Sequence, residues 1–217
     1  MSSWLEDVRD FLPLLLSGLR ITVAITVCAL VLSVVLGFLW ALMGMSRFAL
    51  LRAASRTLIN TVRGIPILVQ LFYIYFVLPD LGVTLNAFSA GVLGLGLAYS
   101  VYQAENFRSG FASVDHSLIE AAQSLGMPEA VIMRRVVLPL AIRVMLPPLG
   151  NTSIMLLKDS SIASTITVAE LTRAGQLLAV STFKNMTIYT LVALLYLAMS
   201  LPLSFLTRRL ERRFAAR

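Results

Sequence analysis

Apolar residues along the chain gather in long runs rather than in a short alternating pattern. Stretches without ionisable side chains cover residues 21–46, 64–79, 81–104, 144–157 and 185–207. A hydrocarbon core about 30 Å thick requires roughly 20 apolar residues per helix. The pattern therefore predicts an all-α membrane protein with about five transmembrane helices, of which the second and the fourth are short.

The composition agrees with this fold class. Hydrophobic residues make up 58% of the chain and charged residues 13%, whereas soluble domains are about 45–50% apolar and about 25% charged. We expect a single domain over residues 1–217, with a core of about 17–209 and no separate soluble domain. The formal net charge of +7 fits positive residues that flank spans next to membrane lipid, and it does not indicate nucleic-acid binding.

The distribution of Lys and Arg predicts the orientation. Five spans place the termini on opposite sides, and cytoplasmic loops carry an excess of positive residues. With the N-terminus outside and the C-terminus in the cytoplasm, 13 of the 18 positive residues lie inside. These inside residues are Arg47, Arg52, Arg56, Arg63, Arg108, Arg134, Arg135, Arg143, Arg208, Arg209, Arg212, Arg213 and Arg217.

The two short spans contain prolines and polar residues. Interrupted apolar segments are typical of a transport path, and the freed backbone groups can also be satisfied by neighbouring helices. A transport path and a kinked packing helix therefore both remain open. Polar groups at membrane depth are functional candidates by default, and the candidates for a substrate path or gate are Gln70, Glu105, Asn151, Thr152, Lys158 and Asp159.

Two of these candidates also have a local structural interpretation. Glu105 lies three residues before Arg108, so an ion pair on one helix face is expected. Asp159 precedes two serines and can cap a short helix that begins there. The segment 156–175, "LLKDSSIASTITVAELTRAG", is polar, then amphipathic, and is closed by Gly175. A re-entrant helix, a surface helix or gate at the outer face, and a plain connecting loop all fit it.

The segment 120–139, "EAAQSLGMPEAVIMRRVVLP", is polar although it lies between apolar runs. A helix that begins at Asp115 or Ser117 can end at Leu125, with Gly126 in the left-handed C′ position. Pro128 suits the first position of a second helix, and Pro139 bends or ends that helix. We therefore predict a helix, a sharp turn and a second helix over about 115–139, on the cytoplasmic side.

The first of these helices carries a stripe of small and apolar residues at i, i+3, i+4 and i+7, namely Leu118, Ala121, Ala122 and Leu125. We expect this stripe to face outward toward the groove of another protein, with ion pairs between Glu120 or Glu129 and the adjacent arginines. The residues that would couple such a partner to the membrane helices are Glu120, Ala121, Ala122, Gly126, Arg134 and Arg135.

The same spacing resembles a known signature. Glu120-Ala121-Ala122, then Gly126, and then Val136 with Leu138-Pro139 is similar to the EAA motif of membrane subunits of ATP-binding-cassette importers. The chain has Val136 where that family usually has Ile. Further segments, "RGIPILVQLFYIYF", "AYSVYQAENFRSG" and 156–175, resemble the polar amino-acid permeases of the histidine and glutamine uptake type.

This resemblance implies a type I importer permease fold in the bacterial inner membrane and an assembly of several subunits. The expected partners are a second permease subunit, identical or paralogous, two cytoplasmic ATPases and an extracytoplasmic solute-binding protein. The chain has no G-x-x-x-x-G-K-[ST] phosphate loop. ATP and Mg²⁺ are therefore expected on the partner ATPase, with no cofactor on this chain, and polar amino acids or related zwitterions are the expected substrates.

Two other classes of protein compete with this interpretation. A self-sufficient secondary transporter or channel for small polar solutes would be supported by inverted repeats, and five spans with one EAA segment argue against it. A membrane enzyme would need a catalytic constellation, and the sequence shows no paired carboxylates, histidine cluster or metal-ligand spacing.

Overall fold

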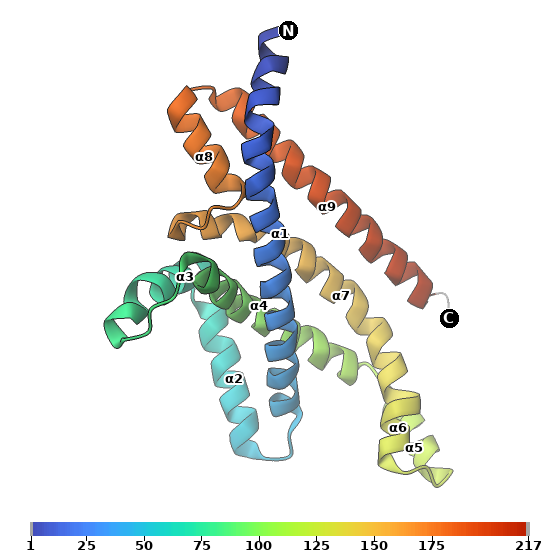
Figure 1. Cartoon of the computed structure of the whole chain (residues 1–217). Coiled ribbons are helices and arrows are strands. Elements are labelled where there is room, and N and C mark those ends of the chain that lie inside the picture. The colour runs from blue at the N-terminus through green and yellow to red at the C-terminus, as the bar shows by residue number, and fades with distance from the viewer. Residues whose placement is uncertain (1, 216–217) are drawn as a thin grey trace.

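The computed structural model describes residues 2–215 and is all-helical in that part of the chain (Figure 1). Arg217, which the orientation argument counts as an inside residue, lies outside the described residues. The α-helices are α1 (Ser2–Met45), α2 (Ala49–Gly64), α3 (Ile67–Phe72), α4 (Ala87–Ala112), α5 (His116–Ser124), α6 (Glu129–Ile132), α7 (Leu138–Asp159), α8 (Leu171–Thr182) and α9 (Asn185–Ala215).

The expected spans are recovered in part. In the described residues, the helical stretches Glu6–Met45 and Asn185–Arg213 are long and apolar enough to cross a membrane. The stretches Ala49–Gly64 and Ile67–Leu81 meet at an angle of 100° and together meet the same criterion as one broken span. The first helix also begins far earlier than its charge-free run, because the charged residues before residue 21 continue the same helix.

Helices α1 and α4 cross closely in the middle of the molecule (Figure 1). Gly37 lies at the crossing, where an added Cβ would be 2.5 Å from the Gln103 Cβ and 2.7 Å from the Ser100 carbonyl oxygen. Ser33 and Ala41, four residues to either side of Gly37, are buried. Small residues at this spacing let two helices approach in lipid, and here they pack α1 against α4.

Two π turns interrupt the helices, and each ends at the valine of a Val-Leu-Pro sequence. One covers Tyr73–Val77 and the other Met133–Val137, and in each the following leucine donates its N–H to the carbonyl of the first residue of the turn. Proline lacks an N–H and its ring would clash with the carbonyl four residues earlier. The wider π turn removes that clash. Of the two outcomes expected at Pro139, a bend or an end of the helix, the end is excluded, because the chain continues through the π turn directly into α7.

After α7, a 3₁₀ helix (Ser160–Ile166) leads into α8, which packs against α1 and α9 (Figure 1). Gly175 does not close this helix, because α8 continues to Thr182. A Cβ at Gly175 would lie 2.7 Å from Cγ2 of Val192 on α9. This glycine therefore permits the close approach of α8 and α9.

Candidate functional site

Helix α5 is fixed at both ends by local backbone chemistry. The Asp115 carboxylate accepts the Ser117 N–H at 3.0 Å, and that hydrogen bond holds the pKa of Asp115 below its ordinary value. At the other end, Gly126 has φ +72°, its N–H donates to Gln123, and the Met127 N–H donates to Ala122. This pair of bonds is the Schellman motif, so the predicted cap and the predicted C′ glycine are both confirmed.

The second helix of this segment differs from the expectation in one detail. Pro128 is the residue before α6 rather than its first residue, with extended backbone at φ −63° and ψ 148°. Its carbonyl accepts the N–H groups of Val131 and Ile132. The two short helices therefore enclose a sharp corner about Gly126, at the same end of the molecule as the α1–α2 connection (Figure 1).

The predicted stripe on α5 does not face outward as a whole. Ala122 is buried with Ile132 and Val137 in a small core between α5 and the chain that follows the corner. Leu118 and Leu125, in contrast, are 46% and 81% exposed, and Ala121 is exposed beside them. Ala122 therefore holds the corner together, and the exposed residues form the outer surface.

The charged residues of the corner do not pair as expected. Glu120 contacts His116 on the same helix at 3.1 Å, one turn earlier. Arg134 and Arg135 are exposed, and no ion pair of theirs is found among the residues that the structure describes. The two arginines lie within the π turn, so their guanidinium groups remain available at the surface of the corner.

A seam of polar contacts joins α4 and α7. The Tyr99 hydroxyl donates to the Asp159 carboxylate at 2.6 Å, and the Asn106 amide donates to the Thr152 hydroxyl at 3.0 Å. Gln103 lies between them on α4, is fully buried, and accepts a second Asn106 N–H at 3.1 Å. The three α4 residues are spaced at i, i+4 and i+7 on one face of the helix.

The six candidate path residues do not form a single cluster. Only Thr152 and Asp159 belong to the α4–α7 seam. Asn151 and Lys158 are exposed on α7, each one residue before a seam residue. Asp159 does not cap the next helix, because its carboxylate is bonded to Tyr99 and makes no cap hydrogen bond.

The other two candidates lie elsewhere. Gln70 is buried at the break between α2 and α3, where its amide donates to the carbonyls of Val62 and Ile65, both at 2.8 Å. Glu105 pairs with Arg108 at 2.6 Å, as predicted from their i, i+3 spacing. Gln70 therefore supports the kink, and Glu105 lies at a separate pocket between α1, α2 and α4.

A fully buried carboxylate at the start of α8 was not among the predicted residues. Glu170 accepts the N–H groups of Thr172 and Arg173 at 2.9 and 2.8 Å and the hydroxyl of Tyr196 at 2.8 Å. The Thr22 hydroxyl lies 3.4 Å from the same carboxylate. Glu170 thus ties α8 to α1 and α9, and its only signal in the sequence is its position before a helical segment.

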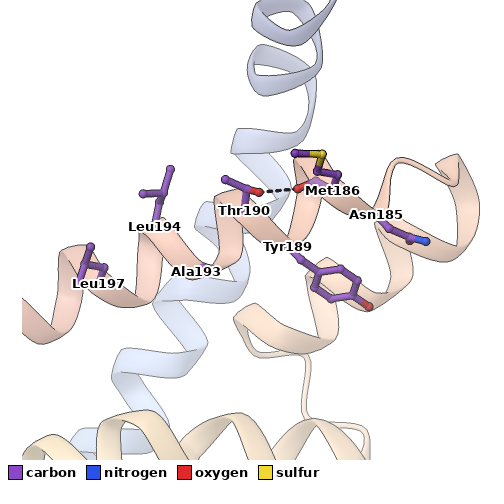
Figure 2. A pocket seen from close by; sticks show the side chains of 7 residues that line it. All are labelled: Asn185, Met186, Tyr189, Thr190, Ala193, Leu194 and Leu197. Atoms are coloured by element: carbon purple, nitrogen blue, oxygen red, sulfur yellow. Dashed lines mark hydrogen bonds between the residues drawn. The ribbon is translucent and has the colours of Figure 1, made fainter.

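A wide hollow of about 590 Å³ runs along the outer face of α9 (Figure 2). Its lining residues all come from one helix and are spaced to share one face, from Asn185 to Leu197. The lining is mostly apolar and has no acidic or basic side chain. This hollow is therefore a feature of a lipid-facing or partner-facing surface and does not resemble a site for a polar solute.

The described residues show no group of three or more His, Cys, Asp or Glu side chains that could hold a metal ion.

Comparison with known proteins places these features in context. The model of the family described as "Binding-protein-dependent transport system inner membrane component" matches residues 33–216. The chain is 37% identical to the probable amino-acid ABC transporter permease protein YckA of Bacillus subtilis, over 94% of this chain and 90% of that protein. It is 39% identical to the glutamine transport system permease protein GlnP of Escherichia coli, over 93% of each.

A solved structure shows the same fold. The crystal structure of an amino acid ABC transporter with histidines superposes with a TM-score of 0.90 and 40% sequence identity, over 95% of this chain and 97% of that chain.

Proposed function

The chain belongs to the family of inner membrane components of binding-protein-dependent transport systems, and from this premise we propose that it carries polar amino acids or related zwitterions in an ATP-driven importer. The relatives are named for amino-acid and glutamine transport. The observation that supports a partner-driven mechanism is the exposed and charged corner about Gly126. A separate ATPase would supply the hydrolysis of ATP with Mg²⁺.

In this proposal the corner is the coupling element. The groove of a cytoplasmic ATPase receives the exposed residues of α5, including Glu120 and Ala121, together with Gly126. Arg134 and Arg135 flank the contact. Because the small core around Ala122 joins the corner to the start of α7, a movement of the ATPase is transmitted as a movement of α7. The membrane helices then exchange between outward-open and inward-open states.

The polar contacts of the α4–α7 seam support a substrate path along α7. Its polar side chains lie on helices that the coupling corner moves directly, since α7 continues from the corner. Asp159 and Lys158 offer opposite charges at one end of the seam, and Asn151 with Thr152 offer neutral polar groups two turns away. A zwitterion that passes along α7 would meet these groups in turn. Gln70 and Glu105 have roles at the kink and in the separate pocket.

Asp159→Asn should lower the rate of uptake by about tenfold or more, because a charge-assisted hydrogen bond from the ammonium group of the zwitterion to this carboxylate would contribute about 1.5–3 kcal/mol. The amide can still accept the Tyr99 hydroxyl, so the seam keeps its shape. Uptake of a radiolabelled amino acid into proteoliposomes checks this. Tyr99→Phe, which keeps the carboxylate, is the matched control and should lose less activity. Unchanged uptake by Asp159→Asn would remove Asp159 from the path.

We propose five spans, with the N-terminus outside and the C-terminus in the cytoplasm. The excess of arginine in the inside segments and the lengths of α1 and α9 support this topology. Alkaline phosphatase, which is active only outside the cytoplasm, should be active when it is joined to the N-terminus and inactive when it is joined to the C-terminus. The reverse result would overturn the orientation.

The experiment that tests the function measures ATP hydrolysis by the assembled transporter. Liganded solute-binding protein should raise the hydrolysis rate of the ATPase only when this chain is present in the same nanodisc. Each polar amino acid is supplied in turn to identify the one that the binding protein delivers. A binding protein that never stimulates hydrolysis through this chain, with any amino acid, would reject the proposal.

A further inference from the structure

The pocket at Glu105 is a separate feature from the α4–α7 seam. It has a volume of about 330 Å³ and lies between α1, α2 and α4, with α7 contributing nothing to its lining. Its α1 residues, Trp40 to Gly44, are in the last turns of that helix. The pocket therefore lies toward the end of the molecule that carries the α1–α2 connection and the coupling corner (Figure 1).

Some of the polar groups around this pocket have structural partners. The Ser55 hydroxyl donates to the Trp40 carbonyl at 2.8 Å, and the Trp40 indole N–H donates to the Ser100 hydroxyl at 3.1 Å. These bonds fasten α2 to α1 and α1 to α4. They leave the ring of Trp40 as an apolar wall, which is extended by Ala41, Gly44, Ile59 and Ala104.

Other polar groups in the lining have no such partner. Within residues 2–215, no carboxylate forms an ion pair with the Arg56 guanidinium, and the structure gives no hydrogen bond to the side chain of Asn60. Both residues are exposed on α2, four positions apart and so on the same face. On the α4 wall, the Arg108 guanidinium donates to Oε2 of Glu105, and the structure gives no hydrogen bond to Oε1 of the same carboxylate.

This set of groups is complementary to a free amino acid. An α-carboxylate requires donors, and guanidinium groups bind carboxylates with strong, charge-assisted hydrogen bonds. An α-ammonium group requires an acceptor, which Glu105 provides from the facing helix. The volume falls within the range of small-molecule sites, about 300–1,000 Å³. An anion alone would leave Glu105 as a repulsive neighbour, so the opposed charges favour a zwitterion.

We propose that this pocket is a second amino-acid site, on the cytoplasmic side, in which Arg56 and Asn60 bind the α-carboxylate and Glu105 binds the α-ammonium group. The proposal rests on the proposed function for the orientation of the chain and for the identity of the solute. Occupation of the pocket joins α2 to α4. Amino acid that accumulates in the cell would therefore slow further import by holding these helices together.

Equilibrium binding of radiolabelled L-glutamine tests this proposal. The permease is assembled with its ATPase partner in phosphatidylglycerol nanodiscs, without ATP and without binding protein. The wild type should show saturable binding, and Arg56→Gln should weaken it by about tenfold or more. Arg47→Gln is the matched control, since Arg47 is exposed like Arg56, precedes the same helix and does not line the pocket. Its affinity should equal that of the wild type.

Two analogues test whether the pocket recognises both charged groups of the amino acid. Glutamine α-amide lacks the carboxylate and N-acetylglutamine lacks the ammonium group, so each should compete about tenfold more weakly than glutamine. Three results would each overturn the proposal. They are the absence of saturable binding to the wild type, an affinity of Arg56→Gln equal to that of the wild type, and competition by N-acetylglutamine as strong as that by glutamine. Loss of the same binding in Asp159→Asn would assign it to the α4–α7 seam and would also overturn it.

Uptake by the same preparation separates this inference from the proposed function. Proteoliposomes that import glutamine, yet bind none in the pocket, would overturn only the second site. Proteoliposomes in which no polar amino acid is imported with the ATPase and binding protein present would contradict the proposed function itself.

Discussion

Gly126→Asp should abolish uptake while leaving the subunit inserted in the membrane and the ATPases able to hydrolyse ATP. The backbone at Gly126 is in the left-handed region, with φ +72° and no atom within 4 Å of an added Cβ. The substitution therefore causes no clash inside the chain. It strains the turn by about 1–2 kcal/mol and adds a carboxylate at the centre of the proposed docking surface. Uptake and ATP hydrolysis are measured on the same proteoliposomes.

Gly82→Asp is the matched control for this variant. Gly82 also has a left-handed backbone, with φ +85°, and open space around its Cβ position, but it follows the 3₁₀ turn Leu78–Leu81, far from the corner in sequence. The same strain and the same charge are introduced there. Gly82→Asp should keep most of the uptake, and equal losses in the two variants would show that backbone strain alone explains the effect.

Glu170→Ala should destabilise the subunit more than removal of the half-buried carboxylate of Glu211. Two N–H groups at the start of α8 lose their acceptor, which costs roughly 1 kcal/mol, and the Tyr196 hydroxyl loses a buried partner at about 1–3 kcal/mol. The apparent Tm in detergent should fall by about 5 °C or more. Glu211→Ala, on the part of α9 that follows the apolar segment, is the control and should leave the Tm unchanged.

Glu170→Gln distinguishes the charge from the hydrogen bonds. Its amide oxygen can replace one carboxylate oxygen as the acceptor of the α8 cap, and the Tyr196 hydroxyl can rotate to accept from the amide nitrogen. We expect this variant to recover most of the Tm lost in Glu170→Ala. A Tm for Glu170→Gln as low as that of Glu170→Ala would mean that the negative charge itself stabilises the bundle.

The features that could be predicted from the sequence are those set by neighbouring residues. The Asp115 cap, the left-handed Gly126 and the ion pair between Glu105 and Arg108 each involve groups within four residues of one another. Local backbone chemistry fixes such contacts whatever the rest of the fold does. For the same reason, the length and polarity of the runs were sufficient to predict an all-helical membrane protein.

The contacts that could not be predicted join distant parts of the chain. Tyr99 and Asp159 are 60 residues apart, and Glu170 reaches Thr22 across 148 residues. A polar residue in an apolar run shows that a partner exists and does not show which residue it is. The burial of Ala122 has a related cause, because the stripe on a short helix does not reveal on which side the following segment packs.

The central claim is that this chain transports only when an ATPase and a solute-binding protein drive it. Its most direct test is uptake of a radiolabelled polar amino acid into proteoliposomes that contain the chain with both partners, with either one omitted, or with neither. The account predicts vanadate-sensitive uptake in the complete system alone. Uptake of the same amino acid by the chain without ATPase and without binding protein would contradict it and would indicate a secondary transporter or channel.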